Sequence, residues 1–119
     1  MKKGFTLIEI VISMAILAIG LVGILSLFPV GFDSARRSIN LTQASLYAQE
    51  KLTQIKKDGF PDVGTTNGTF TNSKYSWTAD VTDETPTGYL RKVVLTVKWN
   101  YKNREHQEIF TTYVAKYAP

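Results

Sequence analysis

The sequence predicts an α+β fold: one long N-terminal α-helix, transmembrane in its first half and amphipathic in its second, packed on a small antiparallel β-sheet of about three to four strands. Two observations support this prediction. Residues 10–32 contain no charged side chain, and apolar residues then recur at helical spacing as far as Lys57. Beyond Lys57, three segments alternate apolar and polar side chains, as half-buried strands do.

Composition limits what the chain can be. Its 119 residues support at most one small domain, and without cysteine its core must be held by packing alone. The net charge is +4, and it falls to 12 − 10 = +2 if residues 1–4, with two lysines, are removed. So modest a charge argues against nucleic-acid binding as the main role.

The second half of the predicted helix covers residues 33–57. It carries apolar residues at spacings of three and four, with Asn40 and other polar residues between them, so one face is ready to pack on a sheet. A basic last turn followed by Gly59 and Pro61 predicts the end of the helix near Lys57. The apolar positions are Leu41, Ala44, Ala48, Leu52 and Ile55.

Three strands are predicted after a turn-rich loop over residues 62–72. They cover residues 75–82, 92–101 and 108–115, the first two separated by a loop over residues 83–88 and the last two by a tight turn at residues 102–104. Four strand aromatics are interpreted as core residues: Tyr75, Trp77, Trp99 and Tyr101.

Three kinds of N-terminal segment could contain such a charge-free run: a cleaved secretory signal, a plain membrane anchor, or a more specialised membrane helix. A bilayer-spanning helix needs about 20 apolar residues, whereas a cleaved secretory signal has an apolar region of only about 7 to 15 residues. The run at residues 10–32 is too long for a secretory signal. A plain anchor explains the length but not Glu9, because a carboxylate at the edge of the membrane is costly without a partner.

Residues 2–9, Lys-Lys-Gly-Phe-Thr-Leu-Ile-Glu, resemble the prepilin peptidase recognition sequence of type IV pilins and type II secretion pseudopilins. The resemblance implies a leader peptide at residues 1–4, cleavage between Gly4 and Phe5, N-methylation of Phe5, and a role for Glu9 in assembly and subunit register. Cleavage would give Phe5 a cationic amine that Glu9 of a neighbouring subunit could neutralise. It would also remove two lysines that hold the helix at the headgroups.

One departure from the family pattern narrows the prediction. Major pilins carry a helix-distorting proline at the position of Ser26, whereas here the proline is Pro29, which predicts a kink or loosened helix over residues 25–29. Residues 18–23, Ala-Ile-Gly-Leu-Val-Gly, look more like minor pilins of the PilV kind and minor pseudopilins of the GspI kind. The chain therefore resembles a minor subunit.

The resemblance implies a division of the chain into residues 1–4 as leader, 5–32 as transmembrane and filament-core helix, 33–57 as amphipathic continuation, and 58–119 as the sheet of a globular head. It implies a structural filament subunit, not an enzyme, first held in the bacterial cytoplasmic membrane with the head outside the cytoplasm, then part of a periplasmic or surface filament. The expected partners are prepilin peptidase/methyltransferase, other pilin or pseudopilin subunits, the inner-membrane assembly platform and, before assembly, the lipid bilayer. The alternatives are a major pilin of a simple pilus and a membrane-anchored binding module that does not assemble.

Few residues suggest other chemistry. The single histidine, His106, lies near Glu105 and Glu108, but two groups on one strand face do not make a metal site, and we interpret it as part of a solvated strand end. No metal, cofactor or catalytic residue is predicted. The basic pairs at residues 36–37 and 56–57 could contact DNA, but such pairs are more typical of a solvated helix face.

Overall fold

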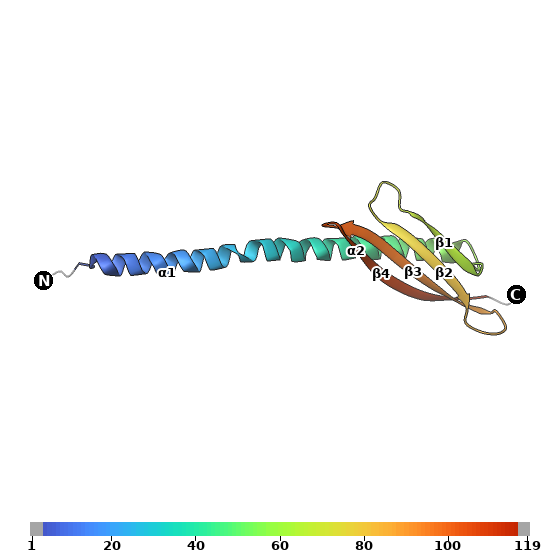
Figure 1. Ribbon diagram of the computed structural model, residues 1–119. Helices are drawn as coiled ribbons and strands as arrows, with labels where there is room; N and C mark the ends of the chain where they lie inside the picture. The colour runs from blue at the N-terminus through green and yellow to red at the C-terminus, as the bar shows by residue number, and fades with distance from the viewer. Residues whose placement is uncertain (1–3, 117–119) are drawn as a thin grey trace. The chain divides into compact units, whose positions relative to one another are not determined.

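The computed structural model describes residues 4–116, which form two helical segments followed by four strands (Figure 1). The chain divides into two compact units, Met1–Ile39 and Asn40–Pro119. The long helical region and the four-stranded antiparallel sheet confirm the predicted α+β fold. The elements are α1 (Leu7–Leu25), α2 (Leu27–Lys57), β1 (Gly64–Thr69), β2 (Ser76–Asp83), β3 (Leu90–Tyr101) and β4 (Arg104–Ala115).

In the first unit, only Ser26 separates α1 from α2. Its backbone stays in the right-handed region (φ −68°, ψ −15°), and its hydroxyl donates to the Gly23 carbonyl at 2.7 Å. The interruption puts Pro29 in the first turn of α2, where an amide has no helical acceptor and a missing N–H costs little. That Pro29 kinks the helix stays a prediction.

The second unit is built on a sheet of order β1-β2-β3-β4, in which every neighbouring pair is antiparallel. The C-terminal part of α2 lies against one face of this sheet (Figure 1). Ala44 and Ala48 of α2 are completely buried, as is Leu95 of β3, because small helix residues let the helix approach the sheet closely. Tyr47, Leu52 and Ile55 of α2 pack around this cluster and are partly buried.

A series of rings extends from the helix across the sheet. Tyr47 of α2 lies 5.3 Å from Tyr75, which lies 5.6 Å from Trp99 of β3, which stacks at 5.9 Å on His106 of β4, all distances being between ring centroids. Tyr75 and Trp99 are buried, as predicted, while Trp77 and Tyr101 are half-buried. The interpretation of His106 as a solvated strand end is wrong, because its imidazole is half-buried against the indole of Trp99.

The buried face of α2 is rotated slightly from the predicted one. Leu41 is 43% exposed, whereas Asn40, predicted to face water, is only 4% exposed. The hydroxyl of Tyr75 accounts for this difference. It is buried and needs a polar partner in the core, and it donates to the Asn40 backbone carbonyl at 3.2 Å.

β1 lies within residues 62–72, which the sequence predicts to be a loop, so that prediction is wrong. Half of the six residues of β1 are glycine or asparagine, which are depleted in strands. The six residues form a strand because each pairs with a residue of β2, from Gly64 opposite Val81 to Thr69 opposite Ser76. Tertiary pairing overrides the local preference here.

β4 begins at Arg104, four residues before the predicted start. Lys102 and Asn103 both have positive φ (52° and 58°), the conformation of a two-residue hairpin turn, so Tyr101 pairs directly with Arg104. The predicted helix end is confirmed at Lys57, and Gly59 follows with φ 104°, which glycine adopts without strain.

Candidate functional site

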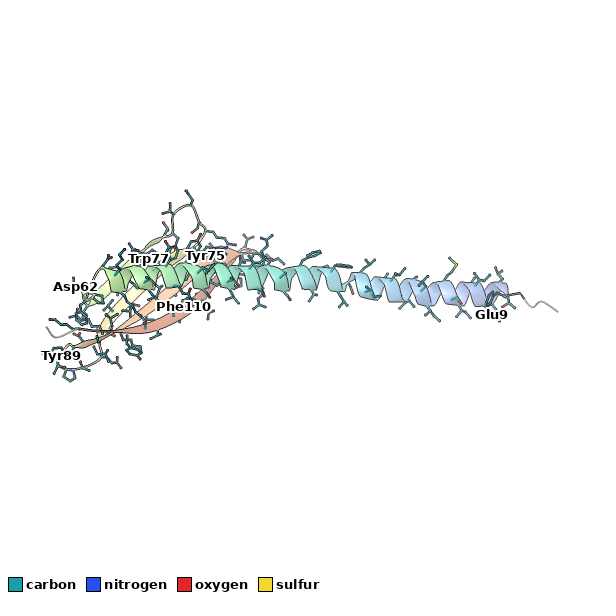
Figure 2. All side chains as sticks on the ribbon, turned by 180° about the vertical axis from the view of Figure 1, so that it is seen from behind. Glu9, Asp62, Tyr75, Trp77, Tyr89 and Phe110 are labelled. Atoms are coloured by element: carbon teal, nitrogen blue, oxygen red, sulfur yellow. The ribbon has the colours of Figure 1, made fainter. Side chains whose placement is uncertain are left out.

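The first turn of α1 is closed by a capping box between Thr6 and Glu9. The Glu9 amide donates to the Thr6 hydroxyl at 3.3 Å, and the Thr6 amide donates to the Glu9 carboxylate at the same distance. Two amides that would lack helical acceptors are thereby satisfied. Figure 2 shows Glu9 at the start of the helix.

Glu9 is exposed and has no ion-pair partner among residues 4–116. Its carboxylate receives one long hydrogen bond and lies at the positive end of the helix dipole, which stabilises an anion by less than about 1 kcal/mol at such sites. Most of the hydrogen-bonding capacity of the carboxylate thus remains available to a donor from outside the chain.

The helix that follows exposes an uninterrupted apolar surface. No residue of α1 is buried, and the helix over Leu7–Lys57 is long and apolar enough to cross a membrane. An open groove of about 490 Å³ lies on the same surface around Gly31, with Phe28 and Phe32 at its sides, and their rings are 6.2 Å apart. Such a surface requires lipid or other helices as its environment. The remaining residues of the groove are Ile24, Leu27 and Ala35.

The predicted cleavage position lies before the helix. Gly4 and Phe5 are exposed and belong to no helix or strand, with Phe5 at 84% exposure. A side chain at Gly4 would meet nothing within 4 Å. The other leader residues, 1–3, lie outside the described part of the chain.

The remaining candidate residues do not form a site. His106 contacts aromatic rings, and within residues 4–116 no three metal-binding side chains come together. The basic pairs at residues 36–37 and 56–57 are exposed. These observations leave the start of α1 as the candidate site.

Sequence reasoning overlooked two features. The capping box is visible as Thr6 followed three residues later by Glu9 and then by an apolar run. The second is a pocket of about 340 Å³ in the unit that begins at Asn40, with Tyr47, Phe70 and Trp77 among its lining residues. No local signal reveals it, because its walls come from α2, β1, β2 and the β1–β2 connection.

Comparison with known families gives one match. The family described as the prokaryotic N-terminal methylation motif matches residues 1–25, which is 25 of the 119 residues. This motif contains the prepilin peptidase cleavage sequence of type IV pilins and pseudopilins, and it supports a type IV pilin-like filament subunit. No curated protein and no solved structure matches the chain.

Proposed function

We propose that this chain, whose first 25 residues carry the N-terminal methylation motif, is a structural subunit of a type IV pilin-like filament, cut between Gly4 and Phe5 and methylated on Phe5. The observation that carries the proposal is the motif match on a segment where an exposed carboxylate, Glu9, lies in the first turn of an apolar helix that has no buried residue. A helix of this kind serves an assembly in which other helices cover it.

Glu9 provides the polar contact of this assembly. Cleavage after Gly4 creates a cationic amine on Phe5, and Glu9 of a neighbouring subunit accepts a charge-assisted hydrogen bond from it. The capping box supports this role, because it orients the carboxylate at the helix start while satisfying only part of it. The amine therefore sets the register between adjacent helices.

The subunit belongs to the minor class, either a minor pilin or a pseudopilin of a secretion filament. Ser26, where major pilins have a proline, supports this assignment, as does the placement of Pro29 in the first turn of α2. Before assembly, residues 5–32 hold the subunit in the cytoplasmic membrane with the head outside the cytoplasm, and the inner-membrane assembly platform extracts it.

The first experiment measures the mature N-terminus. Mass spectrometry of the protein from cells with and without prepilin peptidase should find N-methylated Phe5 only when the peptidase is present. Gly4→Leu should abolish processing while leaving the fold intact, because nothing lies within 4 Å of a side chain at that position. A mature protein that keeps Met1, Lys2 and Lys3 would support the anchored binding module instead.

The second experiment tests Glu9 in assembly. Glu9→Gln keeps an acceptor for the Thr6 amide but removes the negative charge, whereas Glu9→Ala removes both. We expect both variants to be processed and to enter filaments at a small fraction of the wild-type level. Wild-type incorporation of both processed variants would disprove the pairing with Phe5.

Abundance distinguishes the minor subunit from its alternative. Quantitative mass spectrometry of purified filaments should find this chain at a few per cent of the most abundant pilin. Filaments composed mostly of this protein would make it a major pilin and contradict the minor assignment.

A further inference from the structure

β1 is an edge strand without the usual protection. It is the first strand in the sheet order and, within residues 4–116, pairs with β2 alone. Its sequence, Gly-Thr-Thr-Asn-Gly-Thr, contains neither a charged residue nor a proline, and only Gly68 is not fully exposed. Edge strands usually carry charges, prolines or bulges that prevent another strand from pairing with them.

The hydrogen-bonding phase of β1 shows which backbone groups face outward. The Phe70 amide donates to the Tyr75 carbonyl at 3.1 Å, so these two residues form a hydrogen-bonded pair just beyond the end of β1. Hydrogen-bonded and non-hydrogen-bonded pairs alternate along antiparallel strands. Thr65, Asn67 and Thr69 are therefore non-hydrogen-bonded positions, whose amides and carbonyls are directed to the free edge.

A pocket lies beside the end of this edge. It has a volume of about 340 Å³ and includes Thr69, Phe70 and Thr71 on one side and a face of α2 on the other. Phe70 and Tyr47 stack with centroids 4.7 Å apart and give the pocket an aromatic wall. The other lining residues are Glu50, Lys51, Gln54 and Trp77.

The Trp77 indole occupies the inward face of β1 over Gly68. Gly68 is opposite Trp77 in the sheet, and a Cβ at Gly68 would lie 3.0 Å from the indole. The other face of the sheet carries the side chains of Thr65, Asn67 and Thr69, because neighbouring residues of a strand point to opposite faces. An additional strand next to β1 would thus place alternate side chains on the α2 side.

We propose that β1 and the pocket beside it form a strand-addition site, which takes an extended polypeptide segment of another protein and seats one of its apolar or aromatic side chains in the pocket, against the stacked rings of Tyr47 and Phe70. The outward amides and carbonyls recur at the strand period, which only another extended backbone matches along its length. The pocket adds side-chain selectivity to this backbone pairing. The site goes beyond the filament function and does not depend on it.

The contacts that Trp77 makes favour a polypeptide over a sugar as the ligand of this site. A sugar would stack on an indole face, but the Lys51 ammonium lies 3.9 Å from the centre of the Trp77 ring, and the Gly68 backbone packs close to the same ring. Neither contact blocks the backbone edge of β1.

The test uses full-length processed protein in detergent micelles and a phage-displayed library of linear ten-residue peptides. Selected peptides should have a bulky apolar residue with proline-free neighbours. On binding of the synthesised peptides, amide hydrogen exchange at Thr65, Asn67 and Thr69 should slow at least tenfold. Failure to select any peptide, or binding without protection of these three amides, would overturn the proposal.

Matched variants test the contributions of the β1 edge and of the pocket to peptide binding separately. Asn67→Pro removes an outward amide without removing a bond to β2, and should raise the peptide Kd at least tenfold, while Asn67→Ala should leave it within twofold. Gln54→Trp should fill the pocket and weaken binding similarly, while Gln49→Trp, on the same helix but outside the pocket, should not. Equal binding to Asn67→Pro and Asn67→Ala, or binding of a glycan array with no change at the β1 amides, would contradict strand addition.

Discussion

The hydroxyl of Tyr75 donates a hydrogen bond to the backbone carbonyl of Asn40, 35 positions earlier in the chain, at 3.2 Å. The Asn40 side-chain oxygen lies 3.3 Å from the same hydroxyl and accepts from the Lys74 ammonium at 3.0 Å. Asn40 is the one buried polar residue found within residues 4–116. These contacts hold α2 in its register on the sheet, although the Asn40 side-chain nitrogen is buried there without a hydrogen-bond partner among the described residues.

Removing the Tyr75 hydroxyl should weaken this register. We expect Tyr75→Phe to lower the free energy of unfolding by about 0.5–1.5 kcal/mol, the usual net value of a hydrogen bond. Urea unfolding in micelles measures the change. Tyr89→Phe, at a residue that is 56% exposed, is the control and should change stability by less than about 0.5 kcal/mol. Equal values for the two variants would contradict the role of this bond.

Stability should also depend on the protonation of Tyr75. Burial raises the pKa of the Tyr75 phenol above 10.0, and the nearby phenol of Tyr47 raises it further. The folded state therefore holds this proton more tightly than the unfolded state. The stabilisation is fully present below the unfolded pKa of about 10 and is lost as pH rises through the folded pKa. Unfolding free energies measured from pH 9 upward should fall more steeply in the wild type than in Tyr75→Phe, and parallel curves would refute this.

The close approach of Gly68 to Trp77 predicts a cost for any side chain at that position. In Gly68→Ala, the new Cβ would lie about 3.0–3.2 Å from three indole atoms, so the ring must move. We expect a loss of about 1–3 kcal/mol of stability, typical of overpacking, together with a shift in tryptophan emission. Thr66→Ala, in the same strand, should cost less and leave the emission unchanged. Unchanged stability and emission in Gly68→Ala would show that the indole moves freely.

Arg91 ties the segment after α2 to the sheet. Its guanidinium pairs with Asp83 at 2.9 Å, donates to the Pro61 carbonyl and lies over the ring of Phe60. Lysine cannot reproduce this planar set of contacts. Arg91→Lys should therefore lower stability by about 1–2 kcal/mol and speed amide exchange in the segment containing Phe60.

The weaker ion pair of the sheet provides the control for Arg91. Lys98 and Glu105 are 3.7 Å apart, with side chains 42% and 62% exposed. Such a pair contributes about 0–1 kcal/mol. Lys98→Met should therefore cost less than Arg91→Lys, and the reverse order would refute the role assigned to Arg91.

The capping box makes Thr6 responsible for the start of α1. Thr6→Val should remove about 1 kcal/mol of capping stabilisation, the typical value for a lost N-cap. Amide exchange at Glu9 in micelles should then be roughly fivefold faster, and Thr6→Ser should restore the wild-type rate. If Thr6→Val and Thr6→Ser exchange equally, the hydroxyl does not hold this amide.

Sequence patterns predicted those elements whose signal is local. The end of α2 follows from Gly59 and Pro61, and the alternation in β2 and β3 follows from their buried valines and aromatics. β1 is not predicted, because its Gly and Asn residues disfavour a strand and pairing with β2 overrides that preference. Asn40 was misplaced for a similar reason, since its polar partner is 35 residues away.

The features around the candidate site can also be divided into those with a local sequence signal and those without one. Gly4, Phe5 and Glu9 are identified by a short contiguous motif, because a peptidase reads a contiguous segment. The Thr6–Glu9 capping box is equally local and could have been predicted from its spacing. The pocket lined by Tyr47 and Phe70 could not, because it exists only after α2, β1, β2 and the β1–β2 connection come together.

The ring series from Tyr47 to His106 has an experimental consequence. Every tryptophan and tyrosine of the sequence lies at or after Tyr47, so residues 1–46 contain no side chain that absorbs or emits strongly in the near ultraviolet apart from the weak phenylalanines. Trp99 sits within the ring series and Trp77 beneath the Lys51 ammonium. Selectively excited tryptophan emission of the purified protein therefore reports on the sheet-bearing unit alone, and melting of that unit can be followed in vesicles without any introduced dye.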